Sequence, residues 1–100
     1  MPQIHPYQAH ISLNGKQSGE AQIILDKRKI GMLHSITDKP GAKFDLKIID
    51  MNGNEQIVRK DVGTENTRWG EVVDKNLTDN TFIVKVENVR GADTIDIFCE

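Results

Sequence analysis

The stretch Lys43–Val62 reads KFDLKIIDMNGNEQIVRKDV, two runs of alternating side chains separated by a turn. In the first run, Phe44, Leu46 and Ile48 alternate with charged residues, so one face is apolar and the other is charged. The turn contains Asn52-Gly53, a dipeptide that favours a type I′ hairpin because both central positions of that turn need positive φ angles. The stretch therefore predicts a β-hairpin.

Other parts of the chain alternate in the same way. Strands are predicted at 7–13, 17–25, 30–36, 81–88 and 93–99. A second hairpin through Asn14-Gly15 is expected to join the first two of them. In the third, Ile30, Met32, His34 and Ile36 should share the core face, with Leu33 opposite.

The segment from Glu71 to Leu77, taken with Trp69 just before it, lacks this alternation. Its apolar residues recur at a spacing that suits a short helix, while Gly70 and a pair of valines argue against one. We interpret the segment as a loop with one helical turn.

Short strands with turn signals every few residues predict an all-β chain, a small antiparallel β-sandwich or jelly roll of seven to eight short strands. A partly open barrel of the OB type is the alternative. Residues 1–6 contain Pro2 and Pro6 and should form an extended N-terminal arm, followed by one domain at 7–100. The arm either follows the edge of its own domain or reaches a neighbour.

Composition argues against several classes of partner. The 100 residues carry a net charge of −2, which provides no basic field for nucleic acid or an anionic membrane. No apolar run approaches the ~20 residues of a membrane span. The N-terminus does not have the pattern of a signal peptide, so synthesis in the cytoplasm is expected. Cys99 is the single cysteine, which excludes an internal disulfide.

We find no motif for catalysis, a cofactor or a metal, and we expect no enzyme. His5, His10 and His34 lack the spacing of metal ligands, and Cys99 is expected to be a buried structural thiol. Asp50-Met51-Asn52-Gly53-Asn54 resembles the start of a calcium loop, but its glycine is misplaced and a hairpin turn explains it better. The other carboxylates, Asp45 and Asp61 among them, are interpreted as solvated surface.

Three groups of residues are candidate contacts for a protein partner. Arg68 and Trp69 stand together on a polar stretch, and both types are enriched at binding hot spots. Trp69 has a structural explanation too, as a plug at one end of the sandwich. Ile83 and Phe98 fall on outward faces of neighbouring predicted strands and would form one apolar spot if those strands pair. The remaining candidates are in the arm: Ile4, His5 and Tyr7.

In overall style the chain resembles the small β-sandwich decoration, or cement, proteins of tailed-phage capsids. The features that carry the resemblance are the arm Met1–Pro6, the run of hairpins from Tyr7 to Cys99, the single cysteine and the lack of a catalytic motif. The resemblance implies a non-enzymatic virion component that binds the outer surface of a capsid and stabilises it as a homo-oligomer, such as a trimer.

A second class of function remains open at this point. A carbohydrate- or ligand-binding β-sandwich module could use Trp69 as a stacking platform, although such modules generally use several coplanar aromatic rings. Five aromatic residues, one Trp, one Tyr and three Phe, make the sequence poor in such rings. An enzyme whose site is assembled only between subunits is a third possibility, because it would leave no local motif.

Overall fold

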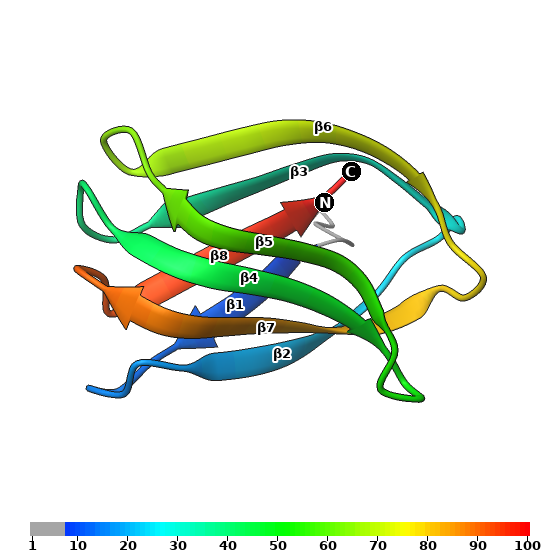
Figure 1. Ribbon diagram of the computed structural model, residues 1–100, viewed down its shortest axis with the longest axis horizontal. Coiled ribbons are helices and arrows are strands. Elements are labelled where there is room, and N and C mark those ends of the chain that lie inside the picture. Colours follow the sequence, from blue (N-terminus) through cyan, green and yellow to red (C-terminus); the bar gives the residue numbers. More distant parts are fainter. Residues whose placement is uncertain (1–7) are drawn as a thin grey trace, which may run out of the picture.

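The computed structural model describes residues 8–100 and folds them into eight antiparallel strands in two sheets of four strands each (Figure 1). The strands are β1 (Gln8–Ser12), β2 (Gly19–Ile24), β3 (Lys29–Thr37), β4 (Lys43–Asp50), β5 (Glu55–Gly63), β6 (Arg68–Asn76), β7 (Thr81–Arg90) and β8 (Thr94–Cys99). Sheet A has the order β1-β8-β3-β6 and sheet B the order β2-β7-β4-β5. The prediction of an all-β sandwich is confirmed, and this strand order is that of a jelly roll.

The core lies between the two sheets and is built from the alternating residues that the sequence pattern predicts. Phe44, Leu46 and Ile48 of β4 are fully buried, at 0% exposure. β7 and β8 contribute Phe82, Val84, Val86, Ile95 and Ile97 to the same core. Burial of each such side chain stabilises the fold by about 1.5–3 kcal/mol. Among residues 8–100 there is no helix with the length and apolar character needed to cross a membrane.

Cys99 ends β8 on the core side and is 2% exposed. This burial raises the pKa of the thiol to about 12. Because the thiolate is the reactive form, the thiol is inert in the folded protein at neutral pH. The prediction of a buried structural cysteine is confirmed.

The hairpin predicted at Lys43–Val62 is confirmed as β4 and β5, but its turn type is not. Within the turn between β4 and β5, Gly53 is the only residue with a positive φ, 89°, whereas a type I′ turn needs two such residues. The carboxylate of Asp50 accepts the backbone N–H groups of Asn52 and Asn54, each at 2.9 Å, and holds a longer turn instead.

The second predicted hairpin is wrong. β1 pairs with β8 in sheet A, and β2 pairs with β7 in sheet B. Asn14 and Gly15, with φ angles of 52° and 81°, do turn the chain, but the turn carries it from one sheet to the other. Both strands keep their predicted apolar faces, because each faces the same core from opposite sides.

The predicted core face of β3 is also wrong beyond its first residues. The backbone N–H groups of Gly31 and Met32 both donate to the carbonyl of Glu100, at 2.7 and 2.9 Å, which is the pattern of a β-bulge. The extra residue shifts the alternation, so Ile30 and Leu33 are both buried. His34 and Met32 consequently lie on the outer face of sheet A.

The segment read as a loop with one helical turn is a strand, β6, at the edge of sheet A. It alternates after all, with Trp69, Glu71 and Val73 half-buried and the residues between them exposed.

The expected apolar spot of Ile83 and Phe98 is wrong as well. β7 and β8 belong to different sheets, which places these two side chains on opposite outer faces of the sandwich. The proposed arm at 1–6, with Ile4 and His5, and the contact residue Tyr7 lie outside the described residues.

Candidate functional site

The outer face of sheet B contains an irregular region centred on Asp45 of β4. Next to this residue, the register of β4 shifts relative to β5, between Phe44 and Leu46, and relative to β7, between Lys43 and Asp45. On each flanking strand a residue other than glycine adopts a left-handed backbone, Asp61 with φ 53° and Asn88 with φ 53°. Bulges and such backbone conformations cost free energy and are frequent next to functional sites.

Asp45 holds both of these irregular residues in place. Its Oδ1 accepts the backbone N–H of Asp61 at 2.8 Å, and its Oδ2 accepts the side-chain amide of Asn88, also at 2.8 Å. The Lys60 ammonium lies 3.7 Å from Oδ2. The hydrogen bond from Asp61, followed by that from Asn88, lowers the pKa of the Asp45 carboxyl below its usual value. The residue is therefore an ionised support of the local backbone.

A cleft of about 400 Å³ opens beside this support, at the end of sheet B where β7 ends. Gln17, Asp45, Asn88 and Arg90 line it, and we call it the Asp45 cleft. Arg90 donates from Nη2 to Asp61 at 3.1 Å, and within residues 8–100 its other N–H groups remain for a ligand. In the described part of the chain the side chain of Gln17 makes no hydrogen bond. Amide and guanidinium groups are thus available at the cleft as donors and acceptors.

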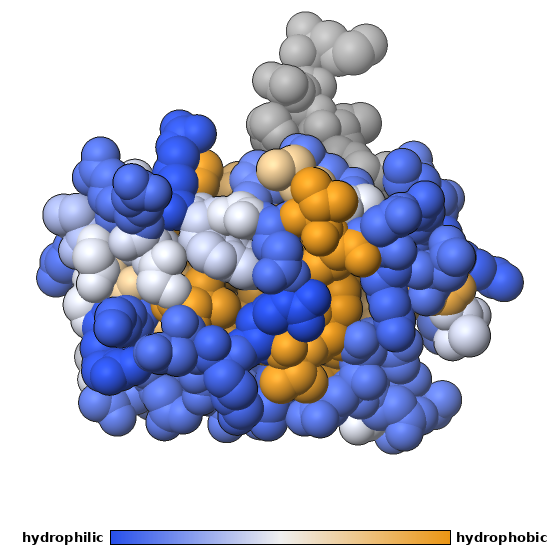
Figure 2. Space-filling view, turned by 45° about the horizontal axis from the view of Figure 1, so that its top comes forward, coloured by the Kyte–Doolittle hydropathy of each residue, from blue (hydrophilic) through white to orange (hydrophobic). Residues whose placement is uncertain are grey.

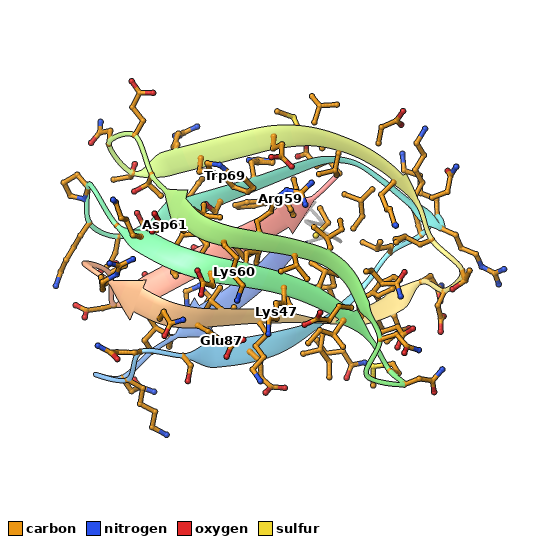
Figure 3. The ribbon with its side chains drawn as sticks, viewed as in Figure 1. Lys47, Arg59, Lys60, Asp61, Trp69 and Glu87 are labelled. Carbon is orange, nitrogen blue, oxygen red and sulfur yellow. The ribbon has the colours of Figure 1, made fainter. Side chains whose placement is uncertain are left out.

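The centre of the same face is occupied by ion pairs within the protein. Lys47 lies 3.1 Å from Glu87 and 3.3 Å from Glu55, so β4 is tied to both of its neighbours (Figure 3). The hydrogen bond to Glu87 is the main cause of a raised pKa at Lys47. These charges are satisfied by one another, which leaves the cleft at the end of the sheet as the better ligand site.

A metal site is not supported by the described residues. Residues 8–100 contain no group of three or more His, Cys, Asp or Glu side chains that could hold an ion. The calcium-like run at Asp50 is a turn, in which the carboxylate accepts backbone N–H groups.

The margin between β5 and β6 contains Trp69. Its side chain points inward from the edge strand and packs, half-buried, against the core. At the same margin, Arg59 Nε of sheet B donates to Glu71 Oε2 of sheet A at 2.6 Å, which joins the two sheets (Figure 3). Arg68 is exposed on the outer face of sheet A, so it and Trp69 point to opposite sides of β6.

The outer face of sheet A contains Phe98, another predicted contact residue. Its ring stacks on that of His34, with centroids 4.9 Å apart and an angle of 18° between the planes. His34 Nε2 lies 3.4 Å from Glu100 Oε1, at ion-pair distance but without a hydrogen bond. Ile83 is half-buried on the other sheet, next to Gln22 and Ile49. The structure does not bring the predicted contact residues together into one site.

The interpretation of Asp45 as a solvated carboxylate missed the cleft, because the side chain is only 15% exposed. The sequence of β7, the strand that contributes Asn88 and Arg90 to the cleft, contained a signal for this irregular region. Val86 and Val89 of β7 are both buried although three positions separate them, and strict alternation would place them on opposite faces. Such a phase change in an apolar pattern indicates a bulge, here at Asn88.

Comparison with known proteins establishes the fold alone. No protein-family model matches the sequence, and no curated protein matches it either. The structure is similar to CpGH89CBM32-6, a carbohydrate-binding module produced by Clostridium perfringens. The TM-score is 0.59 at 9% identity, over 91% of this chain and 76% of that one. PirA matches with a TM-score of 0.54 at 10% identity, over 100% of this chain and 97% of its own.

The SPBc2 prophage-derived protein YomS aligns with 99% of this chain and 97% of its own, at 11% identity. Its TM-score of 0.49 is too low to support an argument about this chain. At these identities the similarities show that the chain shares a β-sandwich architecture with carbohydrate-binding modules.

Proposed function

We propose that the chain is a non-enzymatic binding module that holds a carbohydrate, or a similar polyhydroxylated ligand, in the Asp45 cleft. The observation that carries the proposal is the arrangement around Asp45. One carboxylate holds two left-handed residues, Asp61 and Asn88, beside a cleft lined by amide and guanidinium groups. The β-sandwich shared with a carbohydrate-binding module supports the same class of ligand.

The side chains at the cleft suit hydroxyl groups. A sugar hydroxyl donates one hydrogen bond and accepts others, so its site must offer both kinds of partner. The carbonyl oxygens of Asn88 and Gln17 can accept, and the N–H groups of Arg90 and Gln17 can donate. Asp45 has both oxygens engaged within the protein and acts as a positioning residue.

Among the described residues, the four side chains that line the cleft include no aromatic ring, so the proposed site binds without stacking. Net hydrogen bonds contribute about 0.5–1.5 kcal/mol each, and a handful of them gives weak binding of a single sugar unit. Trp69 packs against the core at a different margin of the sandwich. The proposal therefore rests on Asn88 and Arg90 and leaves Trp69 out of the ligand site.

The test is a titration of ¹⁵N-labelled full-length protein with D-galactose, D-glucose and N-acetyl-D-glucosamine, followed by NMR. At least one sugar should shift the signals of Asn88, Arg90 and Gln17 at millimolar concentration. The Asn88→Ala variant should bind that sugar at least tenfold more weakly, because it loses an acceptor and the contact that orders the bulge. Asn80→Ala removes an exposed amide in the β6–β7 connection and should bind like the wild type. Shifts spread evenly over the surface, or none at the cleft, would rule out this function.

A second candidate is the structural role that the resemblance to capsid decoration proteins implies. The observation that favours it is exposed apolar surface on sheet A, where Val72 is 74% and Met32 is 42% exposed. Surface of this kind is typical of contacts with other proteins. On this reading the chain is made in the cytoplasm and joins the outside of a particle as a closed oligomer. Light scattering after size exclusion should then show an oligomer, and a strict monomer would count against the role.

A further inference from the structure

The outer face of sheet A has a regular grid of side chains that follows from strand register. One row across the sheet is Gln8, Phe98, His34 and Gly70, on β1, β8, β3 and β6 in that order. The next row is His10, Asp96, Ile36 and Arg68. A third row places Glu100 beside Met32 and Val72. These rows show which side chains flank β3 at each level of the sheet. Neighbouring strands lie about 4.8 Å apart, so the side chains of one row are close to each other.

The middle of this face is apolar. Met32 and Val72 are neighbours and are 42% and 74% exposed, while Ile36 and the stacked pair of Phe98 and His34 are half-buried. Figure 2 views the molecule from the margin of β6 and the side of sheet B and shows a band of apolar surface there, while the outer face of sheet A points away from the viewer. Exposed apolar area that no other part of residues 8–100 covers favours association.

The two sides of β3 are complementary to each other. On the β8 side stand a carboxylate, Asp96, and a large ring, Phe98. At the same levels on the β6 side stand a guanidinium, Arg68, and Gly70, which has no side chain. An acidic side chain on one side of β3 thus corresponds to a basic side chain on the other, and an aromatic ring corresponds to a position without a side chain.

We propose that this face binds a second copy of the chain, with a two-fold axis that runs along β3 in the plane of the interface. Rotation about that axis lays β8 of one copy over β6 of the other, and β3 over β3. Asp96 then faces Arg68 of the second copy, and by symmetry Arg68 faces Asp96. At the axis, Met32 contacts Met32 of the second copy and Ile36 contacts Ile36, so both pairs bury apolar surface.

The facing pairs have room to form. Asp96 accepts hydrogen bonds from Gln8 and His10 at Oδ1, so within residues 8–100 its Oδ2 remains for an arginine. The nearest neighbours of a Cβ placed on Gly70 would lie at ordinary contact distances, with His34 Cβ at 3.4 Å, Met32 Cε at 3.8 Å and Leu33 O at 4.0 Å. The outward side of Gly70 is therefore open to the Phe98 ring of the second copy.

The interface is small. One face of a four-stranded sheet offers less than the ~800 Å² per partner of a standard stable complex, so we expect a dimer in the micromolar range. The Asp45 cleft lies on sheet B, at the opposite side of the sandwich, so dimerisation leaves it open. The inference is thus independent of the proposed function.

The test is sedimentation equilibrium of the full-length protein over a concentration series. The wild type should change from monomer to dimer as concentration rises. Arg68→Asp and Asp96→Arg should each weaken the dimer at least tenfold, because each places two like-charged pairs across the axis. An equimolar mixture of the two variants should form a heterodimer, since both pairs across the axis are then Asp–Arg. Lys27→Asp makes the same charge change as Arg68→Asp in the exposed β2–β3 turn and should dimerise like the wild type.

Filling the open position provides an independent variant. Gly70→Leu should also weaken the dimer, because the new side chain occupies the space of the Phe98 ring while φ at this position suits any residue. A wild type that stays monomeric throughout the series overturns the inference, as does a trimeric mass. A dimer that survives Arg68→Asp, or variants that fail to associate with one another on mixing, would overturn it as well.

Discussion

Asp45 shows how one side chain can organise a surface. Its two oxygens accept one backbone and one side-chain hydrogen bond from the strands on either side. Both donors come from residues in a left-handed conformation, which for an L-residue costs about 1–2 kcal/mol. The charge-assisted hydrogen bonds offset that cost and keep both bulges in a single geometry.

Acid should weaken the fold through carboxylates of this kind. Hydrogen bonds and neighbouring cations lower the pKa values of Asp38, Asp45, Asp50, Asp74 and Glu87. A folded-state pKa below the unfolded value stabilises the protein above the unfolded pKa, about 4, and that stabilisation is lost as pH falls through the folded pKa. Urea unfolding between about pH 6 and about pH 3 should therefore show falling stability.

A matched pair of variants isolates the contribution of Asp45 to this loss. Asp45→Asn should lower stability at neutral pH and make the decline on acidification shallower, because the group that titrates is gone. Asp26→Asn, in an exposed turn, should leave the profile close to that of the wild type. Equal slopes for wild type and Asp45→Asn would show that Asp45 does not contribute.

At the scale of elements, close contact between β1 and β2 decides how the sandwich closes at one side. Gly19 opens β2 directly against β1 of the other sheet, and a Cβ there would lie 2.6 Å from Ile11 Cγ2. Ile11 is 2% exposed and belongs to the core, so a shift of its side chain would disturb the packing around it. The position needs glycine for space, since the value of φ there is an ordinary one.

Gly19→Ala should consequently destabilise the protein by about 1–3 kcal/mol, the usual range for overpacking a core. Gly63→Ala is the control, because it also replaces a strand glycine but adds a Cβ that meets nothing within 4 Å. Its effect on the free energy of unfolding should be close to zero. The measurement is urea unfolding of both variants, and equal losses would contradict the steric account.

β3 and β6 show why some elements escaped prediction from the sequence. The bulge at Gly31 needs the carbonyl of Glu100, which comes from the other end of the chain. β6 looked helical because Val72 is apolar yet exposed, while Glu71 is charged yet half-buried beside Arg59. In both cases a contact distant in sequence overrides the local pattern.

At the scale of the whole molecule, the connectivity is almost entirely non-local. Within residues 8–100, β4 and β5 are the only consecutive strands that pair with each other. Every other pairing must close a longer loop before it contributes any stability. A topology of this kind folds in milliseconds to seconds, and the β4–β5 hairpin is the part best able to form early.

Two glycine variants test that order of events. Gly53 in the β4–β5 turn and Gly41 in the β3–β4 connection have φ angles of 89° and 72°, and a Cβ would touch nothing at either. Alanine should cost about 1–2 kcal/mol at each site through its backbone conformation alone. In stopped-flow experiments followed by Trp69 fluorescence, Gly53→Ala should mainly slow folding, and Gly41→Ala should mainly speed unfolding. The reverse pattern would place the hairpin late.

The sequence by itself determined the class of fold and most of the core. Alternation is a local property, because successive side chains of a strand point to opposite faces whatever the strand pairs with. Phe44, Leu46, Ile48 and Cys99 were assigned to the interior on that basis, and the structure buries them.

Apart from the β4–β5 pair, only the tertiary structure decided which strands are neighbours, and with them the Asp45 cleft and the arrangement of side chains on the outer face of sheet A. The alternation within each strand is compatible with several partner strands. Which strands pair depends on how the apolar faces of all eight strands cover one another in the core. Asp61 on β5 and Asn88 on β7 are 16 and 43 residues away from Asp45 along the chain, and they meet it because these two strands flank β4 in sheet B.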